Sequence, residues 1–170
     1  MWRAPWTTRA LGFGPRPEHS RVKSGPELNL FFHDAFGPRI DAGTEFMAAL
    51  GLGADFQPRV LRVLAEGSKD RIEIHFEDVR AVAKMPGVEW IVLIHNHPSG
   101  NSAPSEEDVY LTDKVALWLF RERNALLWDH IITTANVNTH YSFRADRKIR
   151  MREDTAEALR AALRAEGGPR

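Results

Sequence analysis

Residues His95 to Asp108 read HNHPSGNSAPSEED and are the most informative segment of the chain for both structure and chemistry. This segment follows Glu89–Ile94 (EWIVLI), a mostly apolar run that is typical of a strand buried on both faces. If that strand continues into the histidines, His95 and His97 project to the same side, because side chains alternate along a strand. Two imidazoles at this spacing can bind one metal ion, and a catalytic zinc site takes three ligands from the protein. Asp108 is the candidate for the third ligand.

The same residues also have an explanation that needs no metal. The pattern after the loop predicts a helix from Ser105 to about Asn124, with Ser105 as its N-cap. Asp108 then stands at the N3 position, so Ser-Glu-Glu-Asp is close to a capping box. Residue spacing alone leaves both interpretations open.

The composition describes an ordinary globular protein with unusual limits on its metal chemistry. The chain has 170 residues, of which 43% are hydrophobic and 27% charged, and one domain is expected. It contains no cysteine, so any zinc must be held by nitrogen and oxygen ligands. No apolar run approaches the roughly 20 residues of a membrane span, and the N-terminus has no secretory signal pattern. We therefore expect a cytoplasmic protein with no membrane partner.

The net charge is 0, but it is distributed unevenly along the chain. Residues 1–24 carry five basic groups and one acid, and residues 144–170 carry eight basic groups and five acids. The segment between them is acidic, which argues against a nucleic-acid interface there. The basic ends could contact nucleic acid, but solvated ends that aid solubility are the preferred interpretation, so no nucleic-acid partner is predicted.

The remaining patterns predict mixed strands and helices around a central sheet, in the α/β or α+β class. The expected strands lie at 28–33, 39–46, 60–65, 71–76, 89–94, 126–133 and 141–143. The expected helices lie at 78–85, 105–124 and 153–165, and residues 47–58 are expected to form a loop or insertion with a short helix. Three segments follow: a flexible basic arm over 1–26, the domain over 27–150, and a helix with a tail over 151–170.

A family resemblance is carried by the metal-candidate segment and its flanks. HNHPSG followed by PSEED resembles the JAMM signature of the JAB/MPN metalloproteases, and the HNHPSG form resembles the bacterial RadC branch. The likeness extends to IHFEDVRAVAKMPGVEWIVLI before the motif and to LLWDHIITT and YSFR after it, covering roughly residues 28–144. It does not include the helical region that precedes this domain in full-length RadC proteins, so it carries no inference about DNA repair.

The resemblance implies a metallopeptidase or isopeptidase that hydrolyses an amide bond with a zinc-activated water. It implies His95, His97 and Asp108 as zinc ligands and Ser105 as a hydrogen-bond donor to the oxyanion. A glutamate on an early strand would act as general base and acid. The implied fold is a single JAB/MPN-like domain with a curved mixed sheet flanked by helices and zinc at the end of the 89–94 strand.

The catalytic glutamate is the point at which the sequence departs from the family pattern. A gap-free alignment places Val63 at the glutamate position. A second alignment matches residues 28–40 (LNLFFHDAFGPRI) to the opening hairpin of the family, places Glu45 on the next strand and treats residues 47–64 as an insertion. We prefer Glu45, with Glu66 second and Glu27 a further alternative.

Two rival functions follow from the same observations. If the glutamate position is vacant, or if a fourth ligand closes the zinc site, the domain would be an inactive module that binds another protein. The basic ends leave a nucleic-acid accessory protein as the second rival. Asp129-His130 is a candidate for the outer hydrogen-bonding partners that metal-binding histidines usually have, although a structural polar pair explains it equally well. The substrate and the oligomeric state cannot be predicted.

Overall fold

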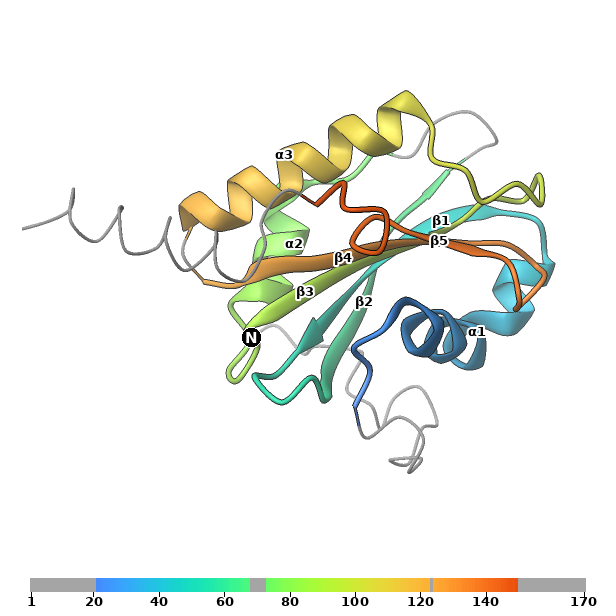
Figure 1. Ribbon diagram of the computed structural model, residues 1–170. Helices are drawn as coiled ribbons and strands as arrows, with labels where there is room; N and C mark the ends of the chain where they lie inside the picture. The colour runs from blue at the N-terminus through green and yellow to red at the C-terminus, as the bar shows by residue number, and fades with distance from the viewer. Residues whose placement is uncertain (1–20, 68–72, 123, 150–170) are drawn as a thin grey trace, which may run out of the picture.

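A computed structural model describes residues 21–67, 73–122 and 124–149, which form one sheet with helices on both faces (Figure 1). The elements in chain order are α1 (Gly25–Asp41), β1 (Glu45–Leu52), β2 (Pro58–Gly67), α2 (Phe76–Ala83), β3 (Trp90–Asn96), α3 (Glu106–Glu122), β4 (Leu126–Thr133) and β5 (His140–Ser142). The strand order is β2-β1-β3-β4-β5. The pair β3 and β4 is parallel and the other pairs are antiparallel, so the predicted mixed sheet is confirmed.

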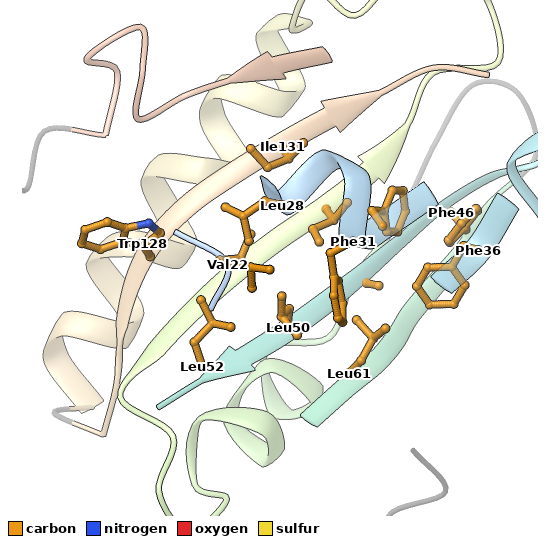
Figure 2. Packing of buried hydrophobic residues seen from close by; sticks show 14 of the residues in the cluster. Val22, Leu28, Phe31, Phe36, Phe46, Leu50, Leu52, Leu61, Trp128 and Ile131 are labelled. Carbon is orange, nitrogen blue, oxygen red and sulfur yellow. The ribbon is translucent and has the colours of Figure 1, made fainter. Parts of the chain in front are cut away.

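The two faces of the sheet bury separate apolar clusters. Helix α1 covers one face, and α2 and α3 cover the other (Figure 1). On the α1 face, Phe31 and Phe36 pack with Phe46 and Leu50 of β1, as Figure 2 shows. Burial of such side chains stabilises the fold by roughly 1.5–3 kcal/mol each. Because both faces are covered, the central strands are buried along nearly their whole length.

The prediction of a strand at 28–33 is wrong, because these residues lie in α1. Ser24 and Glu27 form a complete capping box, and the buried positions Leu28, Phe31 and Phe32 repeat with a helical period. The helix continues over residues 34–38, between the two expected strands, and bends at Phe36, which has non-helical dihedral angles. The expected strand at 39–46 is therefore wrong for its first three residues, which end α1, and its last two residues begin β1.

The expectation of a loop or insertion at 47–58 is also wrong, because β1 occupies the first half of that segment, residues 47–52, and β2 begins at its last residue, Pro58. The run MAALGLG has low intrinsic strand preference. Its register between β2 and β3 is decided by packing: a Cβ at Gly51 would lie 2.7 Å from a methyl carbon of Val60 and 2.9 Å from one of Val88. The opening hairpin is β1–β2, and residues 47–64 belong to it rather than to an insertion.

The other predicted elements agree with the structure to different degrees. The strand at 126–133 is confirmed with the same bounds, and the strands at 60–65 and 89–94 and the helices at 78–85 and 105–124 are confirmed with small shifts. Of the expected strand at 71–76, residues 73–75 belong to no element and Phe76 begins α2. The expected helix at 153–165 and most of the expected arm at 1–26 lie outside the described residues. Val22, within that arm, is fully buried.

Candidate metal centre

The two histidines of the HNH segment lie at the carboxyl end of β3. His95 is the second-last residue of the strand and is fully buried. The His97 backbone N–H donates to the Thr133 carbonyl oxygen at 2.8 Å, which continues the β3–β4 ladder past the end of β3. Both side chains therefore project to the face covered by α3, as the alternation predicts.

The imidazoles converge on each other and on the carboxylate of Asp108. The Nε2 atoms of His95 and His97 are 3.0 Å apart. One oxygen of Asp108 lies 3.2 Å from His95 Nε2, and its other oxygen lies 3.3 Å from His97 Nε2. The three residues that the sequence singled out as ligands thus meet at one point, with two nitrogen atoms and a carboxylate facing inward.

The predicted capping box is present and shares its carboxylate with this centre. The Ser105 backbone N–H donates to the Asp108 carboxylate at 2.8 Å, and the Asp108 backbone N–H donates to Ser105 Oγ at 3.1 Å. The capping interaction holds the Asp108 side chain toward β3 at the first turn of α3. The capping-box and metal-ligand interpretations are therefore compatible, because the Asp108 carboxylate can cap the helix and face the histidines at the same time.

Each imidazole uses its outer nitrogen for a protein partner. Nδ1–H of His97 donates to the carbonyl oxygen of Asn101 at 2.9 Å, since a carbonyl can only accept. His95 Nδ1 lies 2.8 Å from Nε2 of His130. The inner Nε2 atoms are left to face each other, and two lone pairs at this separation need a proton or a cation between them. A set of two imidazoles and carboxylate oxygen, without sulfur, fits the donor preference of zinc.

Glu45, at the first position of β1, is a further polar residue close to His95 and His97. Its carboxylate and the His95 and His97 nitrogens lie within 4.8 Å of one another, so this trio could also hold a metal ion. The antiparallel register explains the approach: Met47 pairs with His95, and extending that register by two residues brings Glu45 opposite His97. The centre thus has one carboxylate on each side, Asp108 from α3 and Glu45 from β1.

The alternative glutamates lie elsewhere. Glu66 pairs in register with Phe46 on the α1 face and forms an ion pair with Arg39 at 2.6 Å. Glu27 accepts hydrogen bonds from the Lys23 and Ser24 backbones at the start of α1. Val63, the residue placed by the gap-free alignment, lies inside β2.

Sequence reasoning missed Asn96, which fastens the start of β1. This buried side chain accepts from the Phe46 backbone N–H at 2.9 Å and donates to the Thr44 carbonyl oxygen at 2.9 Å. The two bonds bracket Glu45. The sequence did contain a signal for this role. Asn96 lies between the two histidines, so its side chain must project to the opposite, buried face of the sheet, where a polar group needs hydrogen-bond partners.

The electrostatics of the centre depend on its carboxylates. Burial alone would raise the pKa of Asp108, but the hydrogen bonds that the His95 and His97 rings donate when they are protonated hold it far below its usual range. Burial alone would lower the pKa of His97, but its bonds to Asp108 and Asn101 and the charge of Glu45 raise it overall. In the absence of a metal, the centre therefore favours a positive charge between its ligands, which is the charge that a cation would supply.

Asp129 and His130 make different contacts: His130 faces the metal centre, and Asp129 binds the segment that follows β4. His130 contacts His95, as the outer-partner interpretation requires. Asp129 instead accepts from the Ser142 hydroxyl and from the backbone N–H groups of His130 and Arg144, which ties β4 to β5 and the turn after it.

Comparison with known proteins identifies the family. The model of the RadC-like JAB domain matches residues 31–149, well over half of the chain. This chain belongs to the RadC-like JAB domain family. Its relatives include a UPF0758 protein of Alkaliphilus metalliredigens, 31% identical over 141 residues that make up 80% of this chain and 56% of the relative. A UPF0758 protein of Pseudomonas putida is 36% identical over 69 residues, 41% of this chain and 30% of the relative.

Membership in the RadC-like JAB family establishes the fold and leaves the activity open. The names of these relatives state no activity. The chain spans about a third to about half the length of the relatives cited, so the activity of a whole relative is a matter for proposal. Among the described helices, none is both long and apolar enough to cross a membrane.

Proposed function

We propose that this RadC-like JAB domain is a zinc-dependent metallohydrolase that cleaves peptide or isopeptide bonds. The observation that carries the proposal is the convergence of two imidazole Nε2 atoms, 3.0 Å apart, on the Asp108 carboxylate. His95, His97 and Asp108 would hold the metal. When bound, zinc would supply Lewis acidity, which lowers the pKa of a water ligand toward about 7.

Glu45 is the proposed general base and acid. Its position at the edge of the centre, half-buried and close to both histidines, suits a carboxylate that exchanges protons with water beside the metal ligands. It would take the proton of the attacking water and deliver it to the nitrogen of the leaving amine. That transfer balances the reaction, because cleavage of an amide by water consumes one proton at the amine and releases one from the water.

Ser105 is the proposed donor to the oxyanion. Its Oγ accepts from the Asp108 backbone N–H at 3.1 Å, and this contact does not use its hydroxyl hydrogen. Ser105 is exposed, while Asp108 three residues later reaches the histidines. A hydroxyl in this place can donate to the negative charge that develops on the carbonyl oxygen of a substrate.

The test has two stages. Metal content is measured by mass spectrometry on chelator-free wild-type protein and on His97→Ala, with one zinc per wild-type chain and loss in the variant expected. Hydrolysis is then measured as new free amines released from a mixed peptide library and from peptides branched through a lysine side chain. A well-folded wild type without metal would overturn the proposal.

One alternative has a specific observation in its favour. Glu45 lies within ligand distance of the same histidines, so it could bind the metal together with Asp108 and close the site. A closed zinc site is structural, and the domain would then serve as a protein-binding module. The alternative predicts that Glu45→Gln loses zinc, whereas the enzyme proposal predicts that this variant keeps it.

A further inference from the structure

A chain of hydrogen bonds connects His95 to the backbone of α3, on the side of the imidazole ring that faces away from His97. His95 Nδ1 lies 2.8 Å from His130 Nε2. His130 Nδ1 lies 2.7 Å from the hydroxyl oxygen of Thr112, which lies 2.6 Å from the carbonyl oxygen of Asp108. His95 and His130 are fully buried and Thr112 is 1% exposed, so water does not substitute for these contacts.

The last group in the chain determines where every proton lies. The Asp108 carbonyl can only accept, so the Thr112 hydroxyl donates its one hydrogen to it. Thr112 oxygen must then accept from His130, which places a hydrogen on His130 Nδ1. A neutral imidazole has one hydrogen, so His130 Nε2 is a bare acceptor and takes a hydrogen bond from Nδ1–H of His95. His95 Nε2 is left without a hydrogen and faces His97 Nε2 and the Asp108 carboxylate.

We infer that His130 and Thr112 are positioning residues that hold His95 in the Nδ1–H tautomer and join its ring to the same turn of α3 that carries Asp108. The inference rests on the proposed metal site. The His95 ring and the Asp108 side chain are thereby held in fixed positions relative to each other, because the carbonyl group that sets the tautomer is the backbone carbonyl of Asp108.

The surroundings of His130 support a fixed and uncharged ring. His130 stacks face to face on Phe143, with ring centroids 4.8 Å apart and an angle of 8° between the planes. His130 is fully buried, and its two ring nitrogens contact a hydroxyl and another imidazole rather than a carboxylate. Metal-binding histidines commonly donate to a carboxylate or a carbonyl. Here a neutral imidazole takes that place and adds no negative charge to a centre that already has two carboxylates.

The role of Thr112 explains a helix residue that would otherwise be unfavourable. A threonine hydroxyl that bonds the carbonyl four residues earlier slightly destabilises a helix. Thr112 does so in α3 toward Asp108. Its second contact, with His130, gives the hydroxyl a use that valine or alanine could not supply.

The test measures the tautomer and the metal affinity separately. In metal-free wild type with ¹⁵N-labelled histidine, nuclear magnetic resonance should show both His95 and His130 with hydrogen on Nδ1. Thr112→Val should shift His130 and then His95 away from this state and lower the affinity for Zn²⁺ by about 10–100-fold, the usual effect of losing an outer partner. Zinc affinity is read by competition with a chromophoric chelator.

Two variants serve as controls. Thr112→Ser keeps the hydroxyl and should retain both the tautomer and the affinity. Thr133→Val removes a buried threonine hydroxyl that contacts His33 at 2.9 Å on the other face, and should leave zinc affinity unchanged. Equal affinity and an unchanged His95 tautomer in Thr112→Val would overturn the inference, as would hydrogen on Nε2 of His95 in the wild type. If the wild type takes up no zinc, the proposed function fails, and the tautomer measurement still decides this inference.

Discussion

The two carboxylates of the centre are held in different ways, and the difference matches the proposed roles of Asp108 as a metal ligand and Glu45 as a base. On the α3 side, Asp108 contacts both imidazoles and is fastened by its own capping box. On the β1 side, Glu45 stands at the first position of its strand, after the exposed residues 42–44, and Asn96 fastens the backbone around it. A rigid carboxylate suits metal binding, and one at a strand end can exchange protons with water.

The strongest test of this comparison is to remove the rigid carboxylate. Asp108→Asn should lower zinc affinity by more than the roughly 10–100-fold that losing an outer partner costs, because it removes a proposed ligand. Isothermal titration with Zn²⁺ measures the effect. The matched control is Glu107→Gln, an exposed acid next to it on α3, which should bind zinc as the wild type does. Unchanged affinity in Asp108→Asn would remove Asp108 from the ligand set.

The second test removes the other carboxylate. Glu45→Gln should retain zinc and lose amide hydrolysis by roughly 10²–10⁴-fold, the usual contribution of general acid–base catalysis. Zinc content and amine release are measured on the same sample. Glu66→Gln is the control, because Glu66 lies on the neighbouring strand but faces the α1 side and pairs with Arg39. Loss of zinc in Glu45→Gln would assign Glu45 to the metal and favour the closed, structural site.

A smaller effect is expected from loosening the base without removing it. Asn96→Ala leaves the Phe46 N–H and the Thr44 carbonyl without their partner, so the start of β1 should become mobile. We expect hydrolysis to fall by about tenfold with zinc retained, since positional errors near 1 Å are costly in catalysis. Hydrogen exchange at Phe46 should rise in parallel. Asn29→Ala, which removes another buried asparagine, should not change either measurement. Normal hydrogen exchange at Phe46 in Asn96→Ala would contradict the proposal that Asn96 fixes the backbone on either side of Glu45.

The smallest expected effect concerns a carboxylate outside the centre. Burial raises the pKa of Asp129 from 3.8 to about 6, against the hydrogen bonds from Ser142 and from the Arg144 and His130 backbones. Between those values the folded protein binds more protons than the unfolded chain, so this contribution to stability is present at low pH and is lost as pH rises through 6. From about pH 5 to 7.5, wild type should lose about 1 kcal/mol of unfolding free energy relative to Asp129→Asn. Urea unfolding at both pH values measures it, and parallel pH profiles would contradict it.

The local patterns were informative wherever the determining contacts are close in sequence. The helix at Ser105 and its capping box depend on four consecutive residues, and the β4 strand is a single continuous segment that is buried at every position. The errors lie in the segment from Leu28 to Leu52. There the capping box of Ser24 and Glu27 begins a helix where a strand is predicted, and burial between β2 and β3 overrides the weak strand preference of MAALGLG.

What the sequence determined by itself is the pair of histidines on one side of a buried strand and an aspartate at the N3 position of the next helix. Alternation along a strand and capping at a helix start are local properties, so they can be read from neighbours in the chain. The tertiary structure was needed to select Glu45 over Glu66 beside the histidines, to separate His130 from Asp129, and to bring Thr112 to His130. Those positions depend on the register of β1 against β3 and on the packing of α3 over β4. Such long-range pairing is set by burial over the whole domain and leaves no pattern in the local sequence.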